Sequence, residues 1–146
     1  MPSILLLGAT GLVGSHLILE LHEQYPSLPV TVYVRNTSID DYLTTTAGVA
    51  RIVHGDFSDH AKLTALAEEH DIVINVGSSG DERITEAIMD GLKKRPVRSK
   101  TVLIHMSGTG NFMDLRWKDG AHHDEARIWS VSKLQRESNS PSNKKL

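Results

Sequence analysis

Short apolar runs alternate along the chain with segments of helical periodicity. Five runs are typical of β-strands and cover residues 4–7, 30–34, 51–54, 71–76 and 100–106. Residues 12–24, 59–69 and 81–94 carry apolar residues three or four positions apart, which is the spacing of one helix face. Residues 38–47 predict a weaker helix or an irregular crossover. Strands that alternate with helices predict an α/β fold, with a parallel sheet covered on both faces.

The strand order follows from the handedness of the connections. Right-handed crossovers make this a doubly wound parallel sheet, and we expect the order 3-2-1-4-5. In such a sheet a ligand binds beyond the carboxyl ends of the strands, where the order reverses. The segments that reach this edge are residues 8–14, 35–36, 56–57, 77–79 and 107–110. The sequence thus predicts a ligand site between the first and fourth strands.

Two expectations about the core follow from the same pattern. The helix at 12–24 should turn its apolar residues inward, namely Leu12, Val13, Leu17, Ile18 and Leu21. His105 falls within the fifth predicted strand. There we expect a core histidine with a hydrogen bond rather than a catalytic base.

Three glycines follow the first strand and precede a helix. Gly8 lets the chain turn sharply, Gly11 lets the backbone approach a ligand, and Gly14 lets the helix lie close to the sheet. The free N–H groups and the dipole of the helix then face negative charge. The segment predicted to contact a pyrophosphate is Gly8, Ala9, Thr10, Gly11, Leu12, Val13 and Gly14. The alternative is a tight turn that binds nothing.

The stretch Gly-Ala-Thr-Gly-Leu-Val-Gly has the spacing G-x-x-G-x-x-G, one residue longer than the common dinucleotide fingerprint. It resembles the first turn of the extended and atypical short-chain dehydrogenase/reductases, including their NmrA-like branch. The resemblance covers about residues 3–110. It implies the N-terminal, NAD(P)-binding Rossmann-like portion of such a protein.

The residue after the second strand decides between NAD and NADP. An acid at this place binds the ribose hydroxyls, whereas this chain has Arg35 followed by Asn36, with no carboxylate before Asp40. A guanidinium pairs with a 2′-phosphate through charge-assisted hydrogen bonds. We therefore expect NADP rather than NAD. The alternative is a solvated arginine that merely ends a strand.

Two further segments are candidates for the adenosine. Asp56 and Phe57 follow the third strand, and the resemblance implies that such an Asp–hydrophobe pair holds the adenine. Asp56 and Asp59 are equally suited to cap the next helix, and the two roles are compatible. Gly77 and Ser78 follow the fourth strand, where a small backbone passes near the adenine ribose.

The resemblance also implies a serine near the end of the fifth strand and a Tyr-x-x-x-Lys pair on the next helix. Ser107 occupies the serine's place, but no tyrosine of this chain has a lysine four residues later. Trp129 and Lys133 match the pair with tryptophan in place of tyrosine, and an indole N–H does not serve as an acid. Coincidence is one explanation of this match; a residual catalytic helix is the other.

Length and composition narrow the remaining possibilities. The 146 residues suffice for one domain, expected at 1–137, before a disordered polar tail at 138–146. A net charge of −2 without a basic stripe argues against nucleic-acid partners. No segment is long enough for a membrane span and no signal peptide is visible, so we expect a cytoplasmic protein. Cysteine is absent, and His122 and His123 lack a third ligand at suitable spacing, so no metal site is expected.

Three functions fit these observations. The first is an NADP-binding domain without the standard Tyr–Lys catalytic pair. The second is an NmrA-like sensor, in which the bound NADP alters association with another protein. The third is the cofactor half of an active reductase. A fifth strand at the sheet edge, unless the last helix covers it, predicts either a homodimer through that edge or poor solubility.

Overall fold

The computed structural model describes residues 1–96 and 100–108, all within one compact unit, Met1–Gly108. Five strands alternate with four helices. The strands are β1 (Ile4–Leu7), β2 (Val30–Val34), β3 (Arg51–His54), β4 (Ile72–Asn75) and β5 (Val102–His105). The helices are α1 (Leu12–Gln24), α2 (Asp40–Thr45), α3 (His60–Glu69) and α4 (Glu82–Lys94). Residues 109–137 of the expected domain and the predicted tail at 138–146 lie outside the described residues.

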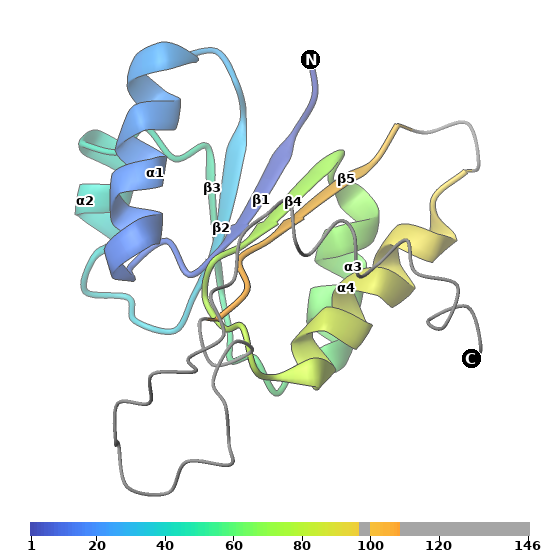
Figure 1. The fold of residues 1–146 in the computed structure, drawn as a ribbon. Helices are drawn as coiled ribbons and strands as arrows, with labels where there is room; N and C mark the ends of the chain where they lie inside the picture. The colour runs from blue at the N-terminus through green and yellow to red at the C-terminus, as the bar shows by residue number, and fades with distance from the viewer. Residues whose placement is uncertain (97–99, 109–146) are drawn as a thin grey trace, which may run out of the picture. The chain divides into compact units, whose positions relative to one another are not determined.

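The five strands form one parallel sheet in the order β3-β2-β1-β4-β5, which confirms the predicted topology. Leu7 of β1 lies opposite Tyr33 of β2 on one side and Asn75 of β4 on the other. The strand order therefore reverses at β1. Figure 1 shows α1 and α2 on one face of the sheet and α3 and α4 on the other.

Each face of the sheet packs against its own helices. On the first face, Ile18 of α1 and Leu43 of α2 pack against Leu6 and neighbouring sheet residues. On the second, Leu63 of α3 and Ile88 of α4 pack in the cluster that contains Leu5, Leu7, Tyr33 and Val73. All of β1 is buried, as an apolar strand covered on both faces must be.

Helices α3 and α4 pack closely because one residue of α4 has no side chain. A Cβ added at Gly91 would lie 2.3 Å from the carbonyl oxygen of Thr64 and 2.7 Å from the Cβ of Ala67. The Thr64 hydroxyl donates to the carbonyl of Ala87, 3.1 Å away, so a polar contact also joins the two helices.

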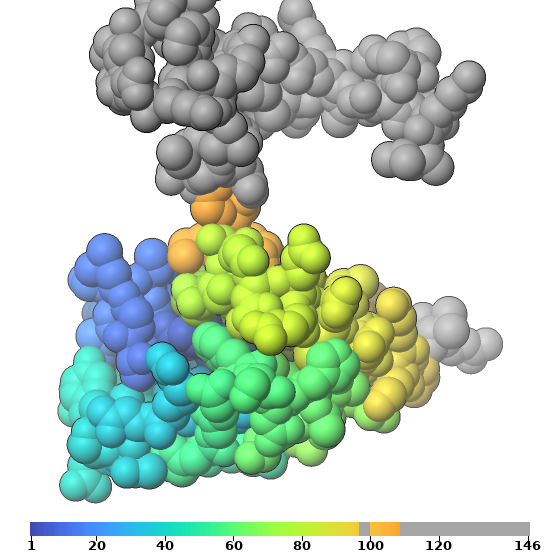
Figure 2. Space-filling model, turned by 90° about the horizontal axis from the view of Figure 1, so that it is seen from below, coloured from blue at the N-terminus to red at the C-terminus, as the bar shows by residue number. Residues whose placement is uncertain are grey.

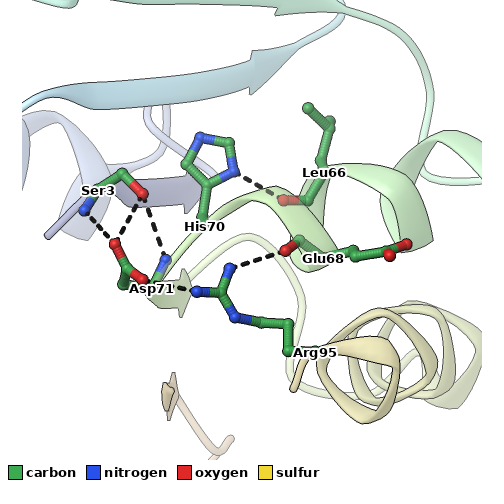
Figure 3. Close-up of polar contacts among 6 residues, drawn as sticks. All are labelled: Ser3, Leu66, Glu68, His70, Asp71 and Arg95. Carbon is green, nitrogen blue, oxygen red and sulfur yellow. Dashed lines mark hydrogen bonds and ion pairs between the residues drawn. The ribbon is translucent and has the colours of Figure 1, made fainter. Parts of the chain in front are cut away.

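At the amino ends of the strands, a polar cluster links β1, β4 and the end of α4 (Figure 3). The Asp71 carboxylate accepts from the backbone N–H of Ser3 at 2.9 Å and from the Ser3 hydroxyl at 3.2 Å. The Arg95 guanidinium lies 2.6 Å from the other carboxylate oxygen and donates to the Glu68 carbonyl at 2.7 Å. The bond from the Ser3 amide is the main cause that lowers the pKa of Asp71, and Arg95 adds to it.

A buried histidine joins α3 to the sheet beside this cluster. His70 Nδ1 donates to the Leu66 carbonyl at 2.7 Å, and Nε2 lies 2.7 Å from the Thr31 hydroxyl of β2. Both ring nitrogens therefore have partners, which accounts for a histidine with only 4% of its surface exposed.

Two expectations about the core were wrong. Leu12 is 82% exposed and Val13 46%, because the first turn of α1 lies beyond the carboxyl end of β1 and has no sheet beneath it. Ile18 is buried as expected, and Leu17 and Leu21 pack partly against the core. His105 is exposed rather than buried, because β5 lies at an edge of the sheet.

Candidate functional site

The glycine turn between β1 and α1 lies where the strand order reverses. Gly8 has φ +87°, a conformation that residues with a side chain rarely adopt. A Cβ at Gly8 would also lie 2.4 Å from the Cα of Gly77, in the loop after β4. The backbones that leave β1 and β4 thus touch each other, and glycine occupies both sides of the contact.

The same turn packs directly on the first turn of α1. The Gly11 N–H donates to the Gly8 carbonyl at 3.0 Å and closes the turn. A Cβ at Gly14 would lie 2.0 Å from the Gly8 carbonyl oxygen and 2.9 Å from the Cα of Ala9. The expected close approach of the helix at Gly14 is therefore present, and its partner is the turn itself.

The amino end of α1 has no side-chain cap and no acidic residue in its first turn. The first helical bond runs from the Ser15 N–H to the Gly11 carbonyl, so the amides of residues 12–14 have no acceptor within the helix. The other long helices differ. Asp59 caps α3 and Asp81 caps α4, each through a carboxylate that accepts a backbone N–H.

The loop after β2 carries Arg35 and Asn36, which the sequence predicts to bind the cofactor near its ribose 2′ position. Arg35 and Asp56 form an ion pair, with Arg35 Nη1 3.7 Å from Asp56 Oδ2, and the Arg35 side chain is 77% exposed. The Asn36 side chain accepts the N–H of Ser38 at 2.9 Å and so shapes the loop. The structure thus brings Arg35 and Asp56, which come from different loops, next to each other.

Asp56 and Asp59 have different roles, although either suits a helix cap in the sequence. Asp59 Oδ1 accepts the N–H of Lys62 at 3.0 Å and caps α3. Asp56 instead accepts the N–H of Ser58 at 3.0 Å, in a turn that precedes the helix. This bond is the main cause that lowers the pKa of Asp56, with a smaller contribution from Arg35. Asp56 is therefore an ionised, exposed acceptor.

Phe57 connects the loop after β3 to the loop after β4. Its ring stacks on Tyr33, with ring centroids 6.1 Å apart and planes 28° apart. A Cβ at Gly77 would lie 2.9 Å from Phe57 Cζ, so the two loops are in contact. Figure 2, which looks onto the carboxyl ends of the strands, shows the blue start of α1 and the green and yellow-green segments that follow β3 and β4 on this one face.

Tyr33 of β2 holds the loop after β3 in place through its hydroxyl. Its hydroxyl donates to the Asp56 carbonyl at 2.8 Å. A Cβ at Gly55 would lie 2.1 Å from that hydroxyl, so the path of the chain toward Asp56 depends on a glycine. Burial is the main cause that raises the pKa of the Tyr33 phenol, and the carboxylates of Asp59 and Asp56 raise it further.

Asn75 shapes the loop after β4, a role that the sequence analysis missed. Its side chain is fully buried and accepts the Gly77 N–H at 3.1 Å. The amide nitrogen donates to the Ser78 carbonyl and to His105 Nδ1, each at 3.2 Å. The available signal was a polar residue that ends an apolar run. The expected hydrogen bond of His105 is therefore present even though its burial is not.

The residues predicted for catalysis are not brought together within the described residues. Ser107 follows β5 and is exposed. Trp129 and Lys133 lie outside the described residues, as do His122 and His123. Residues 1–96 and 100–108 contain no group of three side chains that could hold a metal ion. In the same ranges no helix has the length and hydrophobicity that crossing a membrane requires.

Three solved structures illustrate what this fold is similar to. A short-chain dehydrogenase/reductase (wide type) from Veillonella parvula DSM 2008, in complex with NADP, is 22% identical, with a TM-score of 0.55 over 77% of this chain and 51% of that one. ChuY, an anaerobillin reductase from Escherichia coli O157:H7, is 24% identical, with a TM-score of 0.56 over 78% and 57%. A Rossmann-fold NAD(P)-binding family protein from Shigella flexneri is 22% identical, with a TM-score of 0.53 over 70% and 50%.

The chain spans only 50 to 57% of the length of these three proteins, and the likeness shows the fold. No curated protein matches the sequence. A family model described as NAD(P)H-binding, however, matches residues 8–135, from the first glycine of the turn onward. This match covers most of the chain and shows that the chain belongs to the NAD(P)H-binding family.

Proposed function

We propose that the chain is the dinucleotide-binding domain of a reductase-like protein and that it prefers NADP(H). The observation that carries the proposal is the uncapped amino end of α1, set on a turn of glycines. The amides of residues 12–14 and the helix dipole favour an anion such as a pyrophosphate. Gly8, Ala9, Thr10 and Gly11 supply the small, close backbone that lets it approach.

The preference for NADP(H) rests on Arg35. Its guanidinium is mostly exposed at the end of β2, where a 2′-phosphate would lie if the adenosine follows the sheet edge. Asn36 adds an amide beside it. The long, 3.7 Å pair with Asp56 holds Arg35 loosely, since a charge-assisted bond is normally shorter than 3 Å. A phosphate would therefore compete well for the guanidinium.

The adenine has a proposed site on the other side of Arg35. Asp56 is ionised and exposed, so its carboxylate is available to accept the exocyclic amine of the base. Phe57 offers apolar surface beside it. Gly77 and Ser78 have small side chains or none, so the ribose can approach their backbone. Loops that follow β2, β3 and β4 would thus share the adenosine.

We propose that this chain does not reduce carbonyl compounds through a Tyr–Lys pair. Tyr33, which lies beside Asp56, donates a hydrogen bond to a backbone carbonyl, and its raised pKa makes it a poorer acid. Ser107 and Lys133 remain the candidate catalytic residues. Oxidation of NADPH in the presence of a panel of carbonyl compounds tests this, with no turnover expected.

Calorimetric titration of the full chain with NADPH and with NADH tests the cofactor proposal. We expect NADPH to bind about tenfold more tightly, since a single charge-assisted bond accounts for that ratio. Arg35→Met should remove the preference and leave NADH binding unchanged. Arg51→Met is the control, because Arg51 is an exposed, ion-paired arginine at the opposite end of β3. Absence of heat with both nucleotides would refute dinucleotide binding; equal affinities would refute the preference alone.

We also propose that the chain forms a homodimer through β5. Val102 and Ile104 lie on one face of this strand and Met106 follows its last residue; the three side chains are 47%, 51% and 38% exposed. β5 pairs only with β4 within the described residues, so one row of its backbone groups has no strand beside it. An apolar strand with a free edge favours pairing with another strand, and a second copy supplies one related by two-fold symmetry.

A further inference from the structure

The loop between β2 and α2, residues 35–39, is attached at both ends to two consecutive residues, His54 at the end of β3 and Gly55 just after it. At its start, the Gly55 N–H donates to the Val34 carbonyl at 3.1 Å. At its end, His54 Nε2 lies 3.0 Å from Asp40 Oδ2 and donates to it. The chain that carries Arg35 is thus held against the end of β3 on either side.

The contact between His54 and Asp40 is isolated from other polar groups. The remaining atoms of the pair, His54 Nδ1 and Asp40 Oδ1, are buried and have no hydrogen-bond partner among the described residues. The side chains are 37% and 38% exposed, so the pair is partly shielded from solvent. Loss of one partner would leave His54 Nε2 or Asp40 Oδ2, each in a partly buried side chain, without its protein partner, and that cost favours the bonded arrangement.

The other contacts of the loop do not replace this link. The Ser38 N–H donates to the Asn36 side chain, and the Asp40 N–H donates to the Thr37 carbonyl at 3.3 Å; both bonds are internal to the loop. Ile39 in the loop and Leu43, one helical turn further along α2, pack apolar side chains against the core, and Arg35 pairs loosely with Asp56 at the other end of the loop. The contact between His54 and Asp40 is therefore the polar link that fixes the first turn of α2.

We infer that His54 and Asp40 are positioning residues for cofactor selection. Their bond fixes the loop so that Arg35 and Asn36 are ordered before a 2′-phosphate arrives, which lowers the entropic cost of binding it. The inference rests on the proposed function. It goes beyond that function because it assigns part of the discrimination between NADPH and NADH to a pair that touches neither nucleotide.

Two matched pairs of variants test the inference in the full chain. Asp40→Ala removes the acceptor, whereas Asp40→Asn keeps an oxygen at the same place. His54→Asn moves the donor away, whereas His54→Gln keeps an N–H near the position of Nε2. Asp40→Ala and His54→Asn should weaken NADPH binding about three- to tenfold and change NADH binding less than twofold. Asp40→Asn and His54→Gln should remain within about twofold of the wild type for both nucleotides.

Limited trypsin digestion without nucleotide gives a second, independent readout. Cleavage after Arg35, followed as the fragment of residues 1–35 by mass spectrometry, should be faster in Asp40→Ala and His54→Asn than in their conservative partners. Should Asp40→Ala fail to fold, the two His54 variants carry the comparison, since both retain an amide.

Different outcomes contradict the positioning role of His54 and Asp40 and the binding of a dinucleotide. Equal weakening of NADPH and NADH, or unchanged cleavage after Arg35, would overturn the positioning role and leave dinucleotide binding intact. Failure of the wild type to bind either nucleotide would overturn the proposed function and the selection role with it. In that case faster cleavage in the two disruptive variants would still show that the pair orders the loop.

Discussion

Gly14 shows how a single hydrogen atom in place of a methyl group decides the geometry of the site. Its neighbours are the backbone of Gly8 and Ala9, which cannot rotate away as a flexible side chain would. The spacing of the glycines was enough to predict that α1 comes close at this point. The contact between Gly8 and Gly77 was not predictable, since it depends on the register of two strands 68 residues apart in the chain.

Gly14→Ala should destabilise the fold by about 1–3 kcal/mol, the usual cost of overpacking, although alanine is favoured over glycine in a helix by about 1 kcal/mol. The added Cβ would lie 2.0 Å from the Gly8 carbonyl oxygen. Urea unfolding measures the change. Gly80→Ala is the control, because a Cβ there meets nothing within 4 Å. Equal midpoints for the two variants would contradict the close packing of the turn on α1.

Asn75 illustrates why part of the site could not be predicted from the sequence. A polar residue at the end of an apolar strand has many uses, and only the path of the next loop shows that it holds Gly77 and Ser78 in place. The pair of Arg35 and Asp56 is a similar case. Each was a candidate by itself, and their contact required the order of β2 and β3 in the sheet.

At the scale of elements, periodicity predicted the five strands and the helices α1, α3 and α4, because buried faces demand regular apolar spacing. For residues 38–47 it left a weak helix and an irregular crossover open, and the structure has the short helix α2 there. The errors occurred where an element extends past its partner. Leu12 and Val13 have apolar side chains at helical spacing, but the first turn of α1 lies beyond the sheet. His105 lies in β5, and the predicted strand order already placed this strand at an edge, where a side chain is less covered than in the middle of the sheet.

Asp71 links β4 to β1 and to the end of α4, and this predicts a pH dependence of stability. Its pKa is lowered in the folded chain, so its stabilisation is present above the ordinary value of 3.8 and is lost as the pH falls toward the lowered value. Asp71→Asn should cost about 1 kcal/mol at pH 7, a modest figure because the carboxylate is one-third exposed.

Urea unfolding between pH 7 and pH 3 measures this contribution. The difference in free energy of unfolding between the wild type and Asp71→Asn should shrink as the pH falls below about 4. Glu20→Gln, at an exposed carboxylate of α1, controls for the general loss of negative charge. A difference that stays constant with pH would show that Asp71 acts through packing and not through its charge.

At the scale of the whole molecule, the apolar strip on β5 predicts association of two chains. Ile104→Lys places a charge in the middle of the strip and should convert a dimer into a monomer in sedimentation velocity experiments. Leu19→Lys is the control, since Leu19 is a similarly exposed apolar residue on α1. A wild-type chain that sediments as a monomer over a wide concentration range would refute the proposed interface.

The open amino end of α1 has a consequence for the lifetime of the protein. A partner that binds only the folded chain stabilises it by mass action, and a hundredfold excess over the dissociation constant contributes about 2.7 kcal/mol. Helix α1 lacks the carboxylate that completes α3 and α4. Without bound nucleotide the chain should therefore unfold at a lower temperature and be degraded faster by proteases. Its abundance in a cell would then follow the supply of the ligand.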